Sequence, residues 1–220
     1  VKSDFLTVAQ HQLRTPLSGL RWGLGNVRED ASLSAETRHI VEESAKKVED
    51  AIGIVNEMLR TAEMKTTSFR LEKKSIELGA LVAATLDELK YLAARKRVSV
   101  SFARTERVSV EADEKSLGVA LLNILDNAIR YSPNGKITIA LTGGKGGAEI
   151  TVADTGIGIH PDDLSRLFER FYRGRNAILL DPNESGVGLY IAKQIIEKHG
   201  GAISVDSTLG KGTVARIALP

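Results

Sequence analysis

The segment 11–17 reads His-Gln-Leu-Arg-Thr-Pro-Leu and carries an imidazole that could act as a nucleophile. On a helix, His11 would lie on the outward face, and Thr15 would follow one turn later on the same face. Pro16 has no backbone N–H, so it leaves the carbonyl of Gln12 without its helical partner and favours a local bend. A neutral imidazole, with an ordinary pKa of about 6.5, is a competent nucleophile near neutral pH. Because a surface histidine is most often a plain solvated side chain, this segment alone predicts little.

A second group of chemical residues lies at 123–132, where Asn123 and Asn127 are spaced to share one face of a helix. Amide oxygens are hard ligands that suit Mg²⁺, which also keeps waters and phosphate oxygens. Arg130 can pair with a phosphate group. The alternative is an exposed helix whose polar residues have no function, and this segment alone does not separate the two.

Asp154 directly follows an expected strand at 150–153 and begins the sequence Asp-Thr-Gly-Ile-Gly. A carboxylate here could accept a hydrogen bond from the exocyclic amine of adenine, and Gly156 and Gly158 would let the backbone approach a flat ring closely. Asp-Thr-Gly also occurs in aspartic proteases, which need a second such carboxylate loop or a dimeric enzyme, and an all-β body. The helical patterns described below argue against that alternative.

Two further segments carry groups that suit phosphate. In 167–173, Phe168 and the other aromatic residues can pin a loop to the body, although simple packing also explains them, and Arg173 could reach a terminal phosphate. The segment 185–189 opens a helix with glycines, and backbone N–H groups at such a helix start favour anions. Between them, the polar segment 174–184 is expected to be an irregular lid that orders over a nucleotide.

The familiar phosphate loops are missing from the sequence. No Gly-Lys pair has both the required preceding glycine and a following Ser or Thr, so there is no Walker A loop. Ile191 stands where the dinucleotide fingerprint that begins at Gly186 needs its third glycine. The glycine-rich stretch 142–147 therefore favours a hairpin turn, and a nucleotide site must be built in another way.

The apolar pattern of residues 1–65 predicts two helices joined by a short turn. The apolar residues are spaced alternately by four and three, as in the heptads of packed helices, with Gln10 as an interruption. Asp30, Ser32 and Ser34 mark the turn and a helix cap. A two-helix hairpin cannot bury such seams alone, so we expect a homodimer that forms a four-helix bundle. The seam residues are Leu6, Leu13, Leu17, Leu20, Leu24 and Val27 in the first helix, and Val41, Ala45, Val48, Ile52, Val55 and Leu59 in the second.

After a polar linker at 61–68 the pattern changes to mixed helices and strands, which predicts an α/β sandwich with one sheet covered by helices. The fold class is thus α plus α+β, with two domains at residues 1–65 and 66–220. His199 is expected to act as a cation and a cap at the end of the last helix. Strands are expected at 69–73, 98–102, 108–111, 136–141, 149–153, 202–206 and 213–219, and helices at 76–95, 117–129 and 188–199.

The composition of the 220-residue chain narrows the classes of protein. Apolar residues make up 42% and charged residues 26%, which is ordinary for a globular protein. A net charge of +2 gives no indication of nucleic acid or a membrane surface as a partner. The absence of cysteine excludes disulfides and thiolate metal sites, and no apolar run of about 18 residues could span a bilayer. Because the chain begins with Val1 and shows no signal peptide, we expect a cytoplasmic fragment of a longer protein.

Taken together, these segments resemble the sensor histidine kinases of two-component systems. The stretch 11–17 is similar to their phosphoacceptor box and departs from it at Gln12, where the family normally has an acidic residue that helps to remove the histidine proton. The resemblance implies that His11 takes the γ-phosphoryl group of ATP and passes it to an aspartate of a response regulator. It also implies that Thr15 takes part in dephosphorylating that regulator. General-base assistance typically supplies about 10²–10⁴-fold, so Gln12 predicts a slow kinase.

The later segments resemble, in order and spacing, the N, G1, F and G2 boxes of the histidine kinase ATPase domain, which Hsp90-type, gyrase and mismatch-repair ATPases share. The resemblance implies a left-handed α/β sandwich that binds ATP and Mg²⁺, with Asp154 on adenine and the two amides near Mg²⁺ and the phosphates. Glu184 departs from the glycine that often opens the last box. The implied metal ligands are Asn123 and Asn127, and the implied nucleotide-binding residues are Asn123, Asn127, Arg130, Tyr131, Asp154, Gly156, Gly158, Phe168, Arg173, Gly186, Gly188 and Leu189.

The leading interpretation is a dimeric protein histidine kinase whose catalytic residues are His11, Gln12 and Thr15. One alternative is an ATP-binding pseudokinase or phosphatase scaffold with weak autokinase activity because of Gln12. Another is an Hsp90-like or serine-kinase relative that uses only the ATPase half, against which the histidine box and the heptads argue. The sequence does not identify the stimulus, the regulator, transfer within or between chains, or a membrane anchor of the full-length protein.

Overall fold

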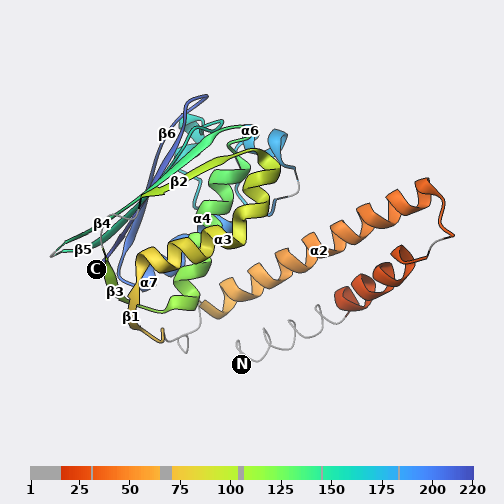
Figure 1. Cartoon of the computed structure of the whole chain (residues 1–220), viewed down its shortest axis with the longest axis horizontal. Coiled ribbons are helices and arrows are strands. Elements are labelled where there is room, and N and C mark those ends of the chain that lie inside the picture. Colours follow the sequence, from red (N-terminus) through yellow and green to blue (C-terminus); the bar gives the residue numbers. More distant parts are fainter. Residues whose placement is uncertain (1–15, 31, 65–70, 104–106, 145, 183) are drawn as a thin grey trace. The chain divides into compact units, whose positions relative to one another are not determined.

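The computed structural model divides into two compact units, Val1–Phe69 and Arg70–Pro220, whose elements are drawn in Figure 1. The predicted domain boundary between residues 65 and 66 falls outside the described residues and stays a prediction. No described helix is both long and apolar enough to cross a membrane. The structure describes residues 16–30, 32–64, 71–103, 107–144, 146–182 and 184–220.

The first unit contains two helical stretches. Residues 16–28 are helical, and α2 follows at Ala35–Met64. The hydroxyl of Ser34 accepts the backbone N–H three residues later at 3.1 Å and so caps α2. Asp30 orders the turn by accepting the backbone N–H of Ser32 at 2.8 Å. The predicted turn and cap are confirmed, and α2 extends beyond the predicted apolar series at both ends.

The hairpin leaves part of its apolar seam uncovered. Val41 is buried, and Leu17 and Leu24 are half-buried. Leu20 and Val27 are 55% and 43% exposed, although both belong to the predicted seam. Water-exposed leucine and valine in a heptad pattern are typical of a surface that pairs with another helix. The homodimer itself stays a prediction.

The second unit is built on a five-stranded sheet in the order β2-β4-β5-β7-β6, with β1 and β3 as a separate antiparallel pair. β2 runs parallel to β4, and the other neighbours are antiparallel. Buried Ile137, Ile139 and Leu141 alternate with exposed residues along β4, so one face of the sheet supplies the core. The strands are β1 (Lys74–Glu77), β2 (Ser99–Ala103), β3 (Ser109–Ala112), β4 (Lys136–Gly144), β5 (Gly147–Asp154), β6 (Ala202–Thr208) and β7 (Gly212–Leu219).

Helices α3 (Leu78–Lys96), α4 (Glu114–Arg130) and α7 (Gly188–Lys198) lie on one side of this sheet (Figure 1). α4 packs against both α3 and α7. The side chains of Leu117, Leu121 and Leu125 in α4 are at most 1% exposed, and burying each contributes about 1.5–3 kcal/mol. The predicted sandwich of a sheet covered by helices is confirmed.

The start of the second unit differs from the prediction. Residues 71–73 are not strand, while 69–70 lie outside the described residues, and β1 begins only at Lys74. Ile76, expected to open a helix, is instead buried in β1 and pairs with β3. Glu77 then caps α3, because its carboxylate oxygens accept two backbone N–H groups of the first helical turn at 2.9 and 3.0 Å. A long-range strand pairing therefore moves the helix start two residues along the chain.

Two segments that were expected to be irregular are regular in the structure. β4 and β5 pair as far as Gly144 and Gly147, so the predicted glycine-rich turn is mostly strand. Within the expected lid, Arg175–Leu180 forms helix α6, and a short helix α5 precedes it at Pro161–Leu164. The Ala-Ile-Leu-Leu run of α6 favours a helix. The Arg173 guanidinium donates hydrogen bonds to carbonyl groups in and just after this helix.

His199 is a buried link between elements. The prediction that it caps the last helix is confirmed, whereas the prediction of a cation is wrong. Its Nε2 accepts the backbone N–H of Asp113 at 3.0 Å, and that nitrogen therefore carries no proton. Its Nδ1 lies 2.8 Å from the carbonyl of Ile195, where it can only donate. The ring, which is 2% exposed, is neutral and joins the end of α7 to the start of α4.

Asp113 caps α4 and ties it to the chain before β1. Its Oδ1 accepts the backbone N–H of Ser116 and its Oδ2 that of Glu72, both at 2.9 Å. Burial alone would raise the pKa of Asp113, but these backbone bonds outweigh burial and hold the pKa below its usual value. The cap is therefore strongest when Asp113 is ionised.

We expect Asp113→Ala to lower the free energy of unfolding by about 1–2 kcal/mol at pH 7, as for the loss of other helix N-caps. Because the folded-state pKa is depressed, this contribution is present above the unfolded pKa of about 3.9 and is lost as pH falls through the folded value. Denaturant unfolding at several pH values measures it, with the exposed Asp87→Ala as control. A loss that does not shrink below about pH 4 would contradict this assignment.

Candidate functional site

Asn123 and Asn127 lie half-buried on one face of α4, as their spacing predicts. Asn123 donates from Nδ2 to the carbonyl of Val119 at 2.9 Å, which leaves its Oδ1 turned outward. That oxygen faces α7, since a Cβ built on Gly188 would lie 2.6 Å from it. No group of three His, Cys, Asp or Glu side chains in the described part of the chain could hold a metal. Amide oxygen, phosphate oxygen and water together make a donor set that suits Mg²⁺.

Asp154 ends β5 with one carboxylate oxygen fixed by the backbone. Its Oδ1 accepts N–H groups from Gly156 at 2.8 Å and from Thr213 at 3.2 Å, so Oδ2 can accept from a ligand. Burial raises the pKa of Asp154, and these bonds and the nearby Ser132 hydroxyl oppose that effect only in part. The Ser132 hydroxyl is itself buried, without a hydrogen bond of good geometry to any described residue.

The loop after Asp154 packs directly on the C-terminal end of α4. Ile157 donates its backbone N–H to the carbonyl of Tyr131 at 3.0 Å. Gly156 approaches so closely that a Cβ would collide with the same carbonyl and would lie 2.5 Å from the Ser132 hydroxyl oxygen. The predicted segments 123–132 and 154–158 are therefore in direct contact along one side of the site.

Gly158 connects this loop to the lid and to β6. At φ +64° it lies against the carbonyl of Thr208, where a side chain would not fit. Asn176 of α6 donates from Nδ2 to the carbonyl of Gly158 at 2.7 Å. Ile159 donates its backbone N–H to the hydroxyl of Ser207 at 2.9 Å. The lid helix and the loop are therefore bonded to each other.

The segment 167–173 is held by contacts of its aromatic residues. The ring of half-buried Phe168 has the Lys193 ammonium 5.2 Å from its centre. Phe171 is 52% exposed and has a φ of +62°, which its backbone bond to the carbonyl of Gly186 at 3.0 Å supports. This bond joins the predicted segment 167–173 to the predicted segment 185–189.

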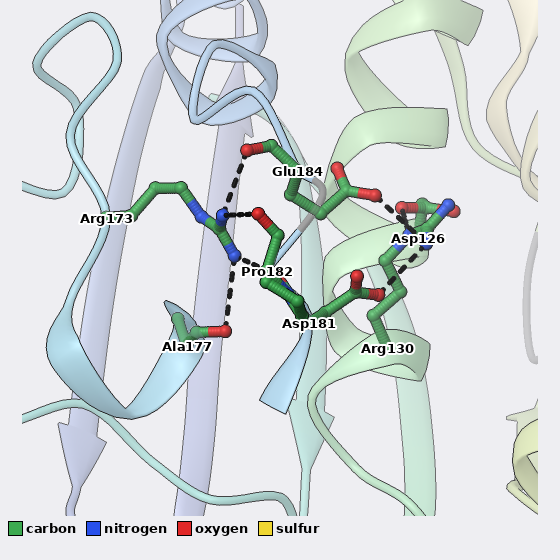
Figure 2. A network of polar contacts seen from close by, with 7 residues as sticks. All are labelled: Asp126, Arg130, Arg173, Ala177, Asp181, Pro182 and Glu184. Carbon is green, nitrogen blue, oxygen red and sulfur yellow. Dashed lines mark hydrogen bonds and ion pairs between the residues drawn. The ribbon is translucent and has the colours of Figure 1, made fainter. Parts of the chain in front are cut away.

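The guanidinium of Arg173 is enclosed by the backbone of the lid (Figure 2). Its Nε is buried and has no partner among the described residues. The predicted contact of Arg173 with a terminal phosphate would therefore require the lid to rearrange. The carbonyl groups that accept its hydrogen bonds belong to Ala177, Asp181, Pro182 and Glu184.

Arg130 lies one turn after Asn127 and contacts three carboxylates (Figure 2). Its Nε is 2.5 Å from Asp126, and its Nη1 is 3.3 Å from Asp181 and 2.9 Å from Glu184. Burial alone would lower the pKa of Arg130, but the three carboxylates raise it above its usual value. Arg130, which was predicted to bind phosphate, is therefore already paired with carboxylates, two of which belong to the lid.

Helix α7 begins at Gly188 without a side-chain cap, since Val187 makes no side-chain bond to the first turn. Free N–H groups and the helix dipole at such a start favour a negatively charged ligand. Gly186, at φ +71°, lets the preceding turn pass close to the Arg173 side chain. Leu189 is half-buried in the first turn. The segment 185–189 thus presents backbone donors beside the side-chain amide of Asn123.

His11, Gln12 and Thr15 lie outside the described residues. Their predicted roles stay predictions. All predicted nucleotide-binding residues are described, and they lie in and just after α4, at the end of β5 and the loop after it, in the segment 167–173, and at the start of α7.

Thr213 belongs to the site although its role was not predicted. Its backbone N–H holds Asp154, and its hydroxyl oxygen lies 2.9 Å from that of Ser207. Gly212 comes so close to the Asp154 carbonyl that a Cβ would collide with it. The Gly-Lys-Gly-Thr run at 210–213 was the available signal, because glycine next to a strand often marks a close backbone approach.

Two family models match the chain. The model described as the His Kinase A (phospho-acceptor) domain matches residues 1–67. The model described as the histidine kinase-, DNA gyrase B-, and HSP90-like ATPase matches residues 112–220. The first match covers the helical part of the chain and ends two residues beyond the predicted boundary, and the second lies within the predicted ATPase part.

Curated relatives align over nearly the whole chain. The phosphate regulon sensor protein PhoR of Pseudomonas aeruginosa is 27% identical over 215 residues, which are 97% of this chain and 48% of PhoR. Sensor protein SrrB of Staphylococcus aureus is 32% identical over 226 residues, covering 100% of this chain and 38% of SrrB. The chain therefore spans less than half the length of these two relatives.

Solved structures share the fold. ShkA, crystallised full-length in complex with AMPPNP, gives a TM-score of 0.82 at 28% identity over 100% of this chain and 46% of the ShkA chain. The mycobacterial sensor histidine kinase MprB gives 0.60 at 33% identity over 67% of this chain and 97% of the MprB chain. With both family models and these relatives in agreement, the chain belongs to the histidine kinase family and combines a phosphoacceptor domain with an ATPase domain.

Proposed function

We propose that this chain is a kinase core that uses Mg-ATP to phosphorylate His11 and then transfers the phosphoryl group to an aspartate of a response regulator. In the first step, an imidazole nitrogen forms a bond to the γ-phosphorus. The bond to the β,γ-bridging oxygen breaks, ADP leaves, and the ring loses its proton. In the second step, a regulator carboxylate oxygen replaces the nitrogen on phosphorus.

The observation that supports this proposal best is the convergence of separate segments on one site. Asn123 meets Gly188 of α7, and Gly156 meets the carbonyl of Tyr131. The backbone N–H groups of Gly156 and Thr213 bind Oδ1 of Asp154, so its Oδ2 can accept a hydrogen bond from the adenine amine. The uncapped start of α7 supplies N–H groups for phosphates. ShkA, a protein of similar fold, was crystallised with AMPPNP, which supports an ATP site here.

The residues present fit a magnesium ion that is shared with nucleotide phosphates. The outward Oδ1 of Asn123 and the amide of Asn127 would hold it on the polar face of α4. When bound, Mg²⁺ neutralises charge on the phosphates and favours departure of ADP. The side-chain amides of Asn123 and Asn127 would also orient the nucleotide beside α7. The γ-phosphoryl group would then have a fixed position relative to the protein.

We further infer a homodimer that buries the uncovered seam, since Leu20 and Val27 remain exposed in the hairpin. The response regulator would bind near Thr15 and also be dephosphorylated there. Because ATP is the substrate, we place this part of the protein in the cytoplasm. The family match to the phosphoacceptor domain supports these partners.

Asp154→Asn should weaken nucleotide binding without lowering the free energy of unfolding. Burial raises the pKa of Asp154, so its charged form lowers stability at neutral pH, and a neutral side chain that still accepts from Gly156 and Thr213 removes that cost. We expect Mg-ATP affinity to fall about 10- to 100-fold, the equivalent of a hydrogen bond to a charged group. The free energy of unfolding at pH 7 should be unchanged or larger by up to about 1 kcal/mol.

Calorimetric titration and denaturant unfolding measure the two quantities. Because burial raises the folded-state pKa of Asp154, the protonated side chain favours the folded state. This stability is fully present below the unfolded pKa of about 3.9 and is lost as pH rises through the folded value. The stability difference between Asp154→Asn and wild type should therefore vanish below about pH 4. Wild-type affinity for Mg-ATP in the variant would rule out Asp154 as the adenine acceptor.

Incubation with Mg-ATP should give an acid-labile, base-stable phosphate on His11. His11→Ala should remove this label, because no imidazole then attacks the γ-phosphorus. His39→Ala, which changes an exposed histidine of α2, is the matched control and should label like wild type. Labelled His11→Ala protein would disprove the assignment of the phosphoacceptor.

Gln12→Glu should raise the rate of autophosphorylation, by up to about 100-fold, because a carboxylate can accept the imidazole proton and an amide cannot. Gln12→Met, which is neutral and of similar length, should give no gain. Single-turnover labelling rates measure both. If wild type hardly labels and Gln12→Glu gains nothing, the pseudokinase or phosphatase scaffold becomes the better description.

A further inference from the structure

The guanidinium of Arg130 has more carboxylates around it than one positive charge can neutralise. Asp126 comes from the same helix, one turn earlier, whereas Asp181 and Glu184 come from the lid. The side chains are largely shielded, with exposed fractions of 24% for Arg130, 17% for Asp181 and 31% for Glu184. Ion pairs that are partly buried are screened less by salt than surface pairs. We call Arg130, Asp181 and Glu184 the lid latch.

Arg173 fixes the backbone that carries the two lid acids. Its terminal nitrogens bind four carbonyl groups between Ala177 and Glu184, including those of Asp181 and Glu184 themselves (Figure 2). A guanidinium with several donors in a rigid plane can order a short loop in this way. The positions of both acidic side chains beside α4 therefore follow from a folded lid.

The lid latch lies beside the groups that would bind phosphate. Arg130 follows Asn127 by three residues on α4 and Asn123 by seven, so all three side chains share one helix face. Asn123 in turn faces the uncapped start of α7. Phosphate oxygens that enter between α4 and α7 would compete with Asp181 and Glu184 for the same guanidinium.

We propose that Asp181 and Glu184 form an autoinhibitory contact, in which they occupy Arg130 in the nucleotide-free protein and must be displaced by the phosphates of ATP. The proposal rests on the proposed function, because it names a control on the same ATP site. Phosphates can replace the two carboxylates on Arg130 because both kinds of group are negatively charged and both bind guanidinium. They cannot occupy it together without repelling each other. Nucleotide entry and opening of the lid are then one coupled event.

The expected change in ATP affinity follows from the fraction of nucleotide-free molecules in which the lid latch is closed. If the lid latch is closed in about 70–90% of empty molecules, the apparent affinity for ATP is reduced about three- to tenfold. Asp181→Asn with Glu184→Gln keeps the shape of both side chains and removes their charge. This double variant should bind Mg-ATP about three- to tenfold more tightly than wild type, and each single variant should give part of that gain.

A double-mutant cycle with Arg130 separates the lid latch from a general change of charge. In an Arg130→Gln background the same two substitutions should give no gain, because the contact they remove is already absent. The matched control is Asp87→Asn with Glu149→Gln, two exposed acids of α3 and β5 that make the same change in net charge. The control should bind Mg-ATP like wild type. Isothermal titration calorimetry measures every affinity, and thermal unfolding verifies that each variant is folded.

Tighter binding that depends on Arg130 supports the proposal. Unchanged or weaker binding in the double variant overturns it, and weaker binding would indicate that the lid acids help to hold magnesium. A gain that persists without Arg130, or that the control also shows, overturns it as well. Failure of every protein, wild type included, to bind Mg-ATP would refute the proposed function and the lid latch with it.

Discussion

The close approach of Gly156 to the carbonyl of Tyr131 is the contact on which the rest of the site depends. No side chain fits between the two, so the loop after β5 must rest directly on the end of α4. That contact holds Asp154 and the asparagines of α4 at a fixed separation, although more than twenty residues divide them in sequence. Gly188 makes a similar close approach, since a Cβ there would lie 2.6 Å from the amide oxygen of Asn123 and would force that side chain to move.

The two sides of the site are held by different forces. α4 and β5 are anchored by apolar burial and backbone hydrogen bonds, which leave little freedom of position. The lid is held mainly by guanidinium contacts, with Arg173 bonded to its carbonyl groups and Arg130 to its acids. Charged contacts of this kind can be exchanged for phosphate without disturbing the core. A rigid adenine side and an adjustable phosphate side suit an enzyme that must bind ATP and release ADP.

Much of the architecture could be predicted from the sequence because it follows from local pattern. The heptads, the alternating strands and the caps at Ser34 and His199 depend on neighbours only a few residues away. The order of the motifs also predicted the segments around Asn123, Asp154 and Gly188 as one site, and close approaches of Gly156 and Gly188 join these segments in the fold.

The predictions that failed depended on contacts between distant residues. Ile76 joined a strand because β3 was there to pair with it, and His199 lost its expected charge because the backbone of Asp113 donates to its ring. The role of Thr213 depends on a hydrogen bond across 59 positions of the chain. Neither propensity nor spacing encodes these interactions, since each requires the folded partner.

A crystal structure of this chain with Mg²⁺ and a non-hydrolysable ATP analogue tests the central claim most directly. The account predicts the adenine amine within hydrogen-bonding distance of Asp154, and the phosphates between the amide of Asn123 and the first turn of α7. An analogue bound elsewhere, or a cavity between these groups that stays closed at saturating nucleotide, would contradict it.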